Sequence, residues 1–103
     1  MRWKALIVTA VCWSLLTYGS AQAAGDIEAG KAKASSCVGC HGADGKGKSP
    51  NPPIAGMDEK QFSEKMNGYK SGTTKHMMMN MLSKKLSDEN IANLAAYYAS
   101  LPK

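Results

Sequence analysis

Two cysteines and a histidine stand close together near the middle of the chain. Cys37, Cys40 and His41 form the sequence C-x-x-C-H. Thiols at this spacing lie about one helical turn apart, so each can add to one vinyl group of a haem while the adjacent imidazole reaches the iron. The pattern therefore indicates a c-type haem attachment site. A structural disulfide, a redox dithiol and half of a zinc site are the alternatives.

The surrounding residues bear on these alternatives. A thioredoxin-like dithiol would follow a strand, and no strand-like alternation precedes Cys37. A zinc site would need a second pair of cysteines or histidines, whereas the only other histidine is His76. The sequence therefore favours haem, with a non-haem C-x-x-C dithiol protein as an alternative.

A methionine cluster bears on the sixth coordination position of the iron. Four of the five residues in 77–81 are methionine: Met77, Met78, Met79 and Met81. They cannot all share one helix face, because consecutive helical residues point about 100° apart. At least one is therefore free to bind iron, and Met57 is a further candidate. A thioether opposite the histidine closes the iron, whereas an open position would make the chain a haem enzyme or a gas-binding domain.

Helices and one long loop must position these groups, and no strand pattern is present. Apolar positions at helical spacing predict helices over 27–39, 59–70 and from Ser87 to just before Pro102, with a short Met-rich helix before the last. Asp26, Asp58 and Ser87 are the expected N-caps. Residues 42–56 contain four glycines and three prolines, which predicts a loop. A loop of this length fits a compact domain when it wraps an object, and haem is such an object.

The prolines of this loop could orient the histidine. A metal-bound histidine usually donates its second ring N–H to a carbonyl. Pro52 and Pro53 offer carbonyls on a stiff segment, although they could equally serve only to shape a turn.

The first 23 residues are typical of a secretory signal peptide. Arg2 and Lys4 precede an apolar run over 5–16, and Ala21-Gln22-Ala23 matches a cleavage site. The run is shorter than the roughly 20 residues of a membrane-spanning helix, so no permanent membrane anchor is expected. Cleavage after Ala23 predicts an exported, periplasmic protein of one domain, residues 24–103. These 80 residues carry a formal net charge of +3, because the leader holds two of the 13 Lys and Arg. A chain of this size usually needs a disulfide, a metal or another bound group to stabilise it in addition to its apolar core.

The predicted mature chain resembles a small class I c-type cytochrome, nearest to the bacterial cytochrome c4, c5 and c553 types. The resemblance covers nearly all of residues 26–101. It is carried by Ala29-Gly30-Lys31, by Cys37-Val38-Gly39-Cys40-His41-Gly42-Ala43-Asp44-Gly45-Lys46-Gly47, by Pro52-Pro53-Ile54-Ala55-Gly56, by Tyr69-Lys70-Ser71-Gly72 and by Leu86-Ser87-Asp88-Glu89 with Leu94-Ala95-Ala96-Tyr97-Tyr98. It implies an all-α class I cytochrome c fold, with three main helices, a short Met-bearing helix and loops around one covalent haem c.

The resemblance also implies a role for individual residues. Cys37 and Cys40 would form the thioether links, His41 would be the proximal ligand, and Pro52 would supply the carbonyl that holds His41. Counting from Gly72 and back from Ser87 makes Met79 the sixth ligand, with Met78 as runner-up. The first and last helices would cross, with Gly30 against Tyr97 or Tyr98. The chain departs from the family at Ala34, where many relatives have an aromatic residue, and at Thr74-Lys75, which replaces a frequent arginine.

The function expected from these features is electron transfer without catalysis of bond making. A soluble carrier would shuttle one electron between redox proteins of the cell envelope. Exposed lysines could steer partners with acidic docking surfaces, and the candidates are Lys46, Lys48, Lys75, Lys84 and Lys85. Nucleic-acid binding is not expected of an exported chain with this mild charge. The expected state is a monomer.

Overall fold

The computed structural model describes residues 25–103, and the predicted signal peptide lies outside the described residues. The regular elements of the described part are all helical, which confirms the all-α class. They are α1 (Ile27–Lys33), the short 3-10 turn η2 (Ala34–Ser36), α2 (Val38–His41), α3 (Glu59–Ser71), α4 (Met77–Lys84) and α5 (Asp88–Ser100). None of the helices in residues 25–103 has the length and apolar character to cross a bilayer.

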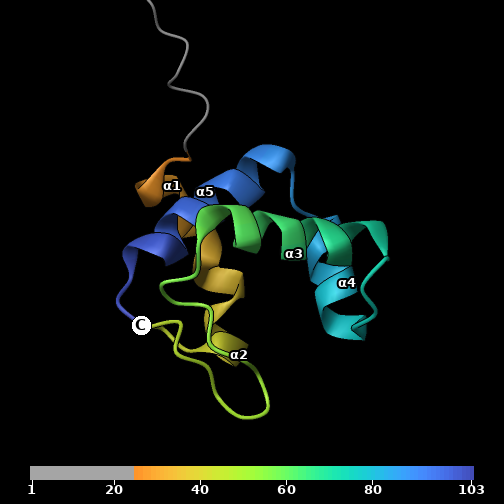
Figure 1. Cartoon of the computed structure of the whole chain (residues 1–103), viewed down its shortest axis with the longest axis horizontal. Coiled ribbons are helices and arrows are strands. Elements are labelled where there is room, and N and C mark those ends of the chain that lie inside the picture. Colours follow the sequence, from red (N-terminus) through yellow and green to blue (C-terminus); the bar gives the residue numbers. More distant parts are fainter. Residues whose placement is uncertain (1–24) are drawn as a thin grey trace, which may run out of the picture.

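The long loop runs beneath the helices (Figure 1). α1 packs across α5, while α3 contacts both α5 and α4. α2 and the loop over 42–58 lie beneath α3, and α4 lies at the opposite end of α3 from α1. The C-x-x-C-H segment and α4 both contribute residues to the lining of one cavity, which is described below.

The helices begin at the predicted capping residues. The side chain of Asp26 accepts hydrogen bonds from the backbone N–H groups of Glu28 and Ala29, which opens α1. Asp58 accepts from Lys60 and Gln61 in the same way at α3. Because the first N–H groups of a helix have no partner within it, these carboxylates fix where each helix starts.

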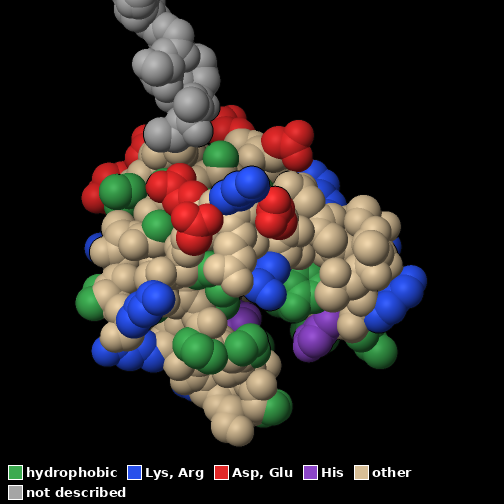
Figure 2. Space-filling model, viewed as in Figure 1, with side chains coloured by type: hydrophobic (Ala, Val, Ile, Leu, Met, Phe, Trp, Pro, Cys, Tyr) green, Lys and Arg blue, Asp and Glu red, His purple; other side chains and the backbone are tan. Residues whose placement is uncertain are grey.

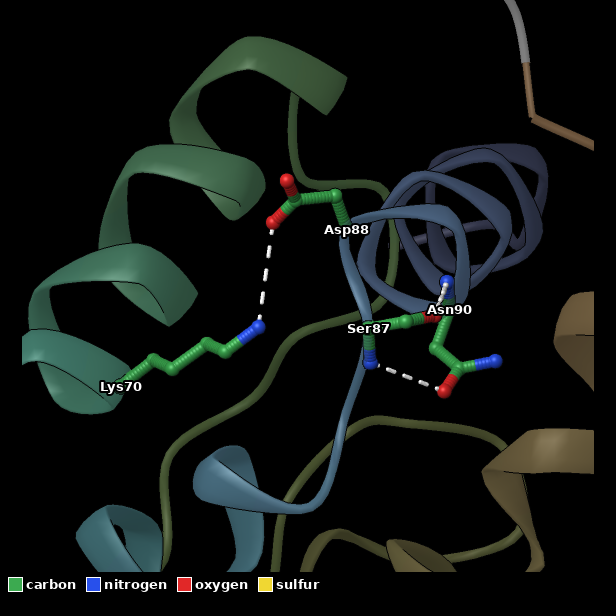
Figure 3. Close-up of polar contacts among 4 residues, drawn as sticks. All are labelled: Lys70, Ser87, Asp88 and Asn90. Atoms are coloured by element: carbon green, nitrogen blue, oxygen red, sulfur yellow. Dashed lines mark hydrogen bonds and ion pairs between the residues drawn. The ribbon is translucent and has the colours of Figure 1, made fainter.

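A capping box opens α5 (Figure 3). The backbone N–H of Asn90 donates to Ser87 Oγ at 3.0 Å, and the Ser87 N–H donates to Asn90 Oδ1 at 3.0 Å. Beside it, Lys70 Nζ lies 3.8 Å from a carboxylate oxygen of Asp88, which links the end of α3 to the start of α5. The capping box thus fixes the start of α5 locally, and the ion pair fixes it relative to α3.

The prediction of one continuous helix over 27–39 is wrong in its second half. The α-helix ends at Lys33, a 3-10 turn follows, and α2 starts only after Cys37. Ser35 and Ser36 occupy the turn, and the Ser36 hydroxyl donates to the Lys33 carbonyl at 3.3 Å. Serine side chains compete with helical backbone hydrogen bonds in this way. The C-x-x-C-H segment therefore forms a short helix of its own, separate from α1.

The apolar core lies between η2, α3 and α5. Most of its buried members come from the predicted apolar stripes of α3 and α5, and Ala34 and Leu86 come from the segments outside these helices. The full set is Ala34, Phe62, Met66, Leu86, Ile91, Leu94, Ala95 and Tyr98. The Phe62 and Tyr98 rings stack with their centroids 5.8 Å apart. The core therefore packs the segment that precedes the cysteines against the helices that line the cavity described below.

The crossing of the first and last helices depends on Gly30. A Cβ built on Gly30 would overlap the Asn93 carbonyl of α5 and lie 2.8 Å from Tyr97 Cβ. No residue with a side chain fits there without moving one helix. This confirms the expected contact of Gly30 with Tyr97.

Candidate functional site

A cavity of about 280 Å³ lies between α2, the long loop, α3 and α4. In the space-filling view a notch opens in the lower part of this face, with histidine side chains on both sides of it (Figure 2). The lining combines two thiols, two imidazoles and thioethers with apolar groups: Ser36, Cys37, Cys40, His41, Pro50, Asn51, Pro52, Ile54, Phe62, Met66, Tyr69, His76, Met78, Met79, Leu82, Leu86 and Leu94. All five predicted site residues, together with the runner-up Met78, therefore line one cavity.

The two cysteine thiols lie one turn apart at the cavity wall. The backbone N–H groups of Cys40 and His41 both donate to the Cys37 carbonyl, at 3.2 and 2.9 Å. This turn is the start of α2, which ends at His41. Cys37 is half-buried and Cys40 is exposed, and neither forms a disulfide. The short helix thus presents two free thiols and an imidazole to the same space.

The His41 ring is held by the loop. His41 is 9% exposed, and its Nδ1 lies 2.8 Å from the Pro52 carbonyl oxygen. Because a carbonyl can only accept, the Nδ1–H donates, and in the neutral ring this leaves Nε2 with a free lone pair. This is the arrangement in which a histidine serves as a metal ligand through Nε2. The structure brings together the two residues that the sequence could only suggest as partners.

The methionines differ in where they lie. Met78 and Met79 line the cavity, and Met79 is half-buried against the core. Met66 lines the cavity from α3 as part of the core. Met57 packs against the core and is not part of the lining, so it does not share the cavity with His41. By their position in the lining, Met78 and Met79 are both candidates for the sixth ligand of the iron.

Asn80 holds the segment that carries these methionines, and the sequence patterns did not single it out. Its Nδ2 donates to the carbonyls of Tyr69 at 2.8 Å and Thr74 at 2.9 Å. Its Oδ1 accepts from the His76 N–H at 2.8 Å. One amide therefore ties the end of α3, the connecting loop and the start of α4 together. The available signal was an asparagine inside a short helix, where it has low helix propensity.

We expect Asn80→Ala to loosen α4. Three hydrogen bonds are lost and their backbone partners are left partly unpaired, which should lower the free energy of unfolding by roughly 2–4 kcal/mol. Chemical denaturation of the holoprotein measures this loss. Asn67→Ala is the matched control, because Asn67 is an exposed asparagine on α3. Equal stability of the Asn80 and Asn67 variants would contradict the role given to Asn80.

Tyr98 lies beneath Cys37 with its hydroxyl buried. The side chain is 1% exposed, and its hydroxyl has no hydrogen-bond partner among the described residues. Burial, and then the neighbouring Cys37, raise the pKa of Tyr98. Burial also raises the pKa of the Cys37 thiol, more than Ser36 and Tyr98 lower it. Both groups are therefore neutral at neutral pH.

This burial predicts a loss of stability in alkali. The folded state binds the Tyr98 proton more tightly than the unfolded chain, whose tyrosines titrate near about pH 10. The stabilisation is complete below that pH and is lost as the pH rises above it, by up to about 1.4 kcal/mol per pH unit. The measurement is the free energy of unfolding as a function of pH above about pH 10. In Tyr98→Phe, the part of its decrease that comes from Tyr98 should be absent. An unchanged dependence of the free energy of unfolding on pH in Tyr98→Phe would contradict this prediction.

The chemistry of the lining fits a covalently attached haem. The two thiols can each form a thioether, the fixed imidazole offers one lone pair, and Met78 or Met79 offers a thioether on the α4 wall. The remaining lining is largely apolar, as a porphyrin face requires. Within residues 25–103, no three His, Cys, Asp or Glu side chains lie close enough to share a metal ion, so a zinc site of that kind is not formed there.

Known proteins resemble the chain over this same region. The family model described as "Cytochrome c" matches residues 27–102. Cytochrome c4 of Pseudomonas aeruginosa is 46% identical over 83 residues, covering 80% of this chain and 41% of that protein. Cytochrome c-554(548) of Halomonas halodenitrificans is 40% identical over 81 residues, covering 75% of this chain and 98% of that protein. The crystal structure of reduced recombinant cytochrome c4 from Pseudomonas stutzeri superposes with a TM-score of 0.72 at 32% identity, covering 77% of this chain and 47% of that chain. The chain thus spans less than half the length of these two cytochrome c4 proteins.

Proposed function

Because this chain belongs to the cytochrome c family, we propose that it is a periplasmic carrier of single electrons whose iron is ligated by His41 and Met79. The fold is the small class I type, and the prosthetic group is haem c, attached covalently. Cys37 and Cys40 are the thiols that we assign to the attachment, since both line the cavity one turn apart. When bound, the haem supplies an iron that alternates between the ferrous and ferric states.

The observation that carries the proposal is the 2.8 Å hydrogen bond from His41 Nδ1–H to the Pro52 carbonyl. It fixes the tautomer and leaves the Nε2 lone pair available to the iron of a bound haem. A ring held in this way would move little when the iron changes its oxidation state. A small rearrangement on electron transfer is what a carrier requires, and the buried position of His41 limits movement further.

A methionine that lines the same cavity as His41 supports a carrier over an enzyme. Met79 lies on α4, half-buried against the core, with its backbone N–H 3.3 Å from His76 Nδ1. A thioether held there closes the iron to oxygen and peroxide and raises the reduction potential. If His41 and Met79 both hold the iron, no open coordination position would remain for a reactant, so we expect no catalysis of bond making.

The location and the partners follow from charge and from the predicted leader. Residues 1–23 would direct export to the periplasm and be removed after Ala23. Five exposed lysines are available to attract acidic redox proteins of the cell envelope: Lys46, Lys48, Lys75, Lys84 and Lys85. The carrier would act as a monomer, without a permanent membrane anchor and without binding nucleic acid.

A visible spectrum of the purified holoprotein tests this proposal. We expect a reduced α-band, colour that stays with the polypeptide after acid-acetone extraction, and the weak far-red band of methionine-ligated ferric iron. Reversible one-electron oxidation and reduction should follow in a redox titration. Ready carbon monoxide binding without the far-red band would instead indicate a gas-binding domain or haem enzyme, and a colourless protein would indicate a dithiol.

A further inference from the structure

Tyr98 carries the one buried side-chain nitrogen or oxygen of residues 25–103 that forms no hydrogen bond. The side chain is 1% exposed, so water does not reach its hydroxyl. A buried donor without a partner costs stability, because it has given up its hydrogen bonds to water. Buried polar groups of folded proteins are nearly always paired, so this hydroxyl needs a physical explanation.

The ring of Tyr98 is fixed, so its hydroxyl cannot turn toward a distant partner. The Phe62 ring stacks on it with the centroids 5.8 Å apart, and the Tyr97 ring meets it edge-on with the centroids 5.0 Å apart. On the long loop, Gly45 lies so close that a Cβ at this position would be 3.1 Å from two carbons of the Tyr98 ring. Any partner of the hydroxyl must therefore lie directly beside it.

The Cys37 side chain lies beside this hydroxyl. Cys37 is half-buried and packs against the core cluster that contains Tyr98. Burial, and then the neighbouring Cys37, raise the pKa of the Tyr98 hydroxyl. With Cys37 as a free thiol, the two groups are neighbours that form no hydrogen bond.

Tyr98 is the donor that remains for the Cys37 sulfur. The Ser36 hydroxyl also lies near this sulfur, but Ser36 is exposed and its hydroxyl donates to the Lys33 carbonyl at 3.3 Å. A hydroxyl has one proton to donate, so the proton of Ser36 is already in use. The proton of Tyr98 has no recipient.

Thioether formation determines which of the two neighbours donates. In the attachment assigned to Cys37, the thiol adds across a vinyl group. The sulfur bonds to one vinyl carbon and its proton passes to the other, so the step needs no oxidant or reductant. The sulfur then carries no proton and can only accept a hydrogen bond, as in any thioether. The donor in such a bond must be the Tyr98 hydroxyl.

We propose that Tyr98 is a positioning residue for the attached cofactor, and that its hydroxyl donates a hydrogen bond to the Cys37 sulfur in the holoprotein. The inference rests on the proposed function, because it requires Cys37 to be an attachment site. Tyr98 belongs to α5 and Cys37 directly precedes α2, so the bond links the attachment segment to the last helix. The sulfur is thereby held from the core, while the His41 ring is held from the loop by the Pro52 carbonyl.

Tyr98→Phe measures this hydrogen bond, because it removes the hydroxyl and keeps the ring. In denaturant unfolding of the holoprotein at pH 7, we expect the equilibrium constant for unfolding to rise about fivefold. Tyr97→Phe is the matched control, since Tyr97 is the partly buried neighbour on α5, and it should change the constant by less than about twofold. If the hydroxyl has no partner in the holoprotein either, Tyr98→Phe will be as stable as the wild type or more stable, which would overturn the proposal.

Proton NMR of the ferrous holoprotein gives a readout that a role in packing alone would not produce. The Tyr98 hydroxyl proton should exchange slowly with water and show cross-relaxation with the proton on the carbon bonded to the Cys37 sulfur. The signal should be absent in Tyr98→Phe and present in Tyr97→Phe. Cross-relaxation with a trapped water instead, or no slowly exchanging hydroxyl proton, would overturn the assignment.

The single cysteine variants show which thioether is involved. Cys40→Ser holoprotein keeps the Cys37 attachment and should keep the cross-relaxation of the Tyr98 hydroxyl. Cys37→Ser holoprotein, attached through Cys40 alone, should lose it. The same cross-relaxation in both variants would contradict a bond to the Cys37 sulfur.

Mass spectrometry of the proteolysed holoprotein separates the failure of this inference from that of the proposed function. We expect a haem-bearing peptide in which both Cys37 and Cys40 are modified. That result without a contact between the hydroxyl and the thioether would reject the role of Tyr98 and leave the carrier intact. An unmodified Cys37 in coloured protein would reject the attachment that we assign to this residue, and a colourless protein would reject the carrier itself.

Discussion

Replacing Cys37 and Cys40 together with serine is expected to give a chain that neither retains haem through extraction nor folds stably. Without haem, the largely apolar lining of the cavity of about 280 Å³ would be left in contact with water, and a folded domain of this size has little stability to offset that loss. We therefore expect loss of covalent colour together with loss of helical circular dichroism at 25 °C.

The single replacements provide the graded control. Cys40→Ser keeps the half-buried Cys37 and one thioether, and Cys37→Ser keeps the exposed Cys40. Each should retain coloured protein of lower stability, with His41 still bound to the Pro52 carbonyl. Ser35→Ala, in the adjacent turn, should behave as the wild type does. A double variant that keeps its colour after acid-acetone extraction would show that neither thiol holds the group.

The helices were predictable where local chemistry determines them. Asp58 and Ser87 cap α3 and α5 as expected, and Gly72 ends α3 with a φ of 86° that favours glycine. Caps act over three or four residues, so the sequence alone contains the needed information. The break after Lys33 was missed, because Ser35 and Ser36 are compatible with a helix unless the packing of the following segment favours the turn.

In the site, too, the residues that are close in sequence were predictable and those that depend on tertiary contacts were not. Cys37, Cys40 and His41 are neighbours in sequence, so their type and spacing were enough to indicate the chemistry. Asn80 was missed, because its hydrogen bonds to the Tyr69 and Thr74 carbonyls exist only once the loop after α3 has turned back. That turn depends on tertiary structure that no short pattern records.

Removal of the Met79 side chain is the second large effect that we expect. In the ferric Met79→Ala holoprotein the methionine–iron band should vanish, and carbon monoxide should bind the ferrous form readily. The reduction potential should fall on the order of 0.1 V, because a thioether favours ferrous iron. The physical reason for choosing Met79 is its half-buried position against the core, where the sulfur is shielded from water.

Met78→Ala is the matched control, since Met78 lines the same cavity but is 52% exposed. An exposed, unbranched side chain must lose more rotamer freedom to hold one position, so Met78 is the poorer ligand. The Met78 variant should keep the methionine–iron band and the wild-type potential, with a small loss of stability. If the band survives in Met79→Ala and vanishes in Met78→Ala, the ligand is Met78. The segment would then be displaced by one residue from the register that Gly72 and Ser87 imply. If each single variant keeps the band and only the double variant loses it, the two thioethers exchange at the iron. The short helix would then position a pair of interchangeable ligands, and Asn80 would fix the segment without selecting between them.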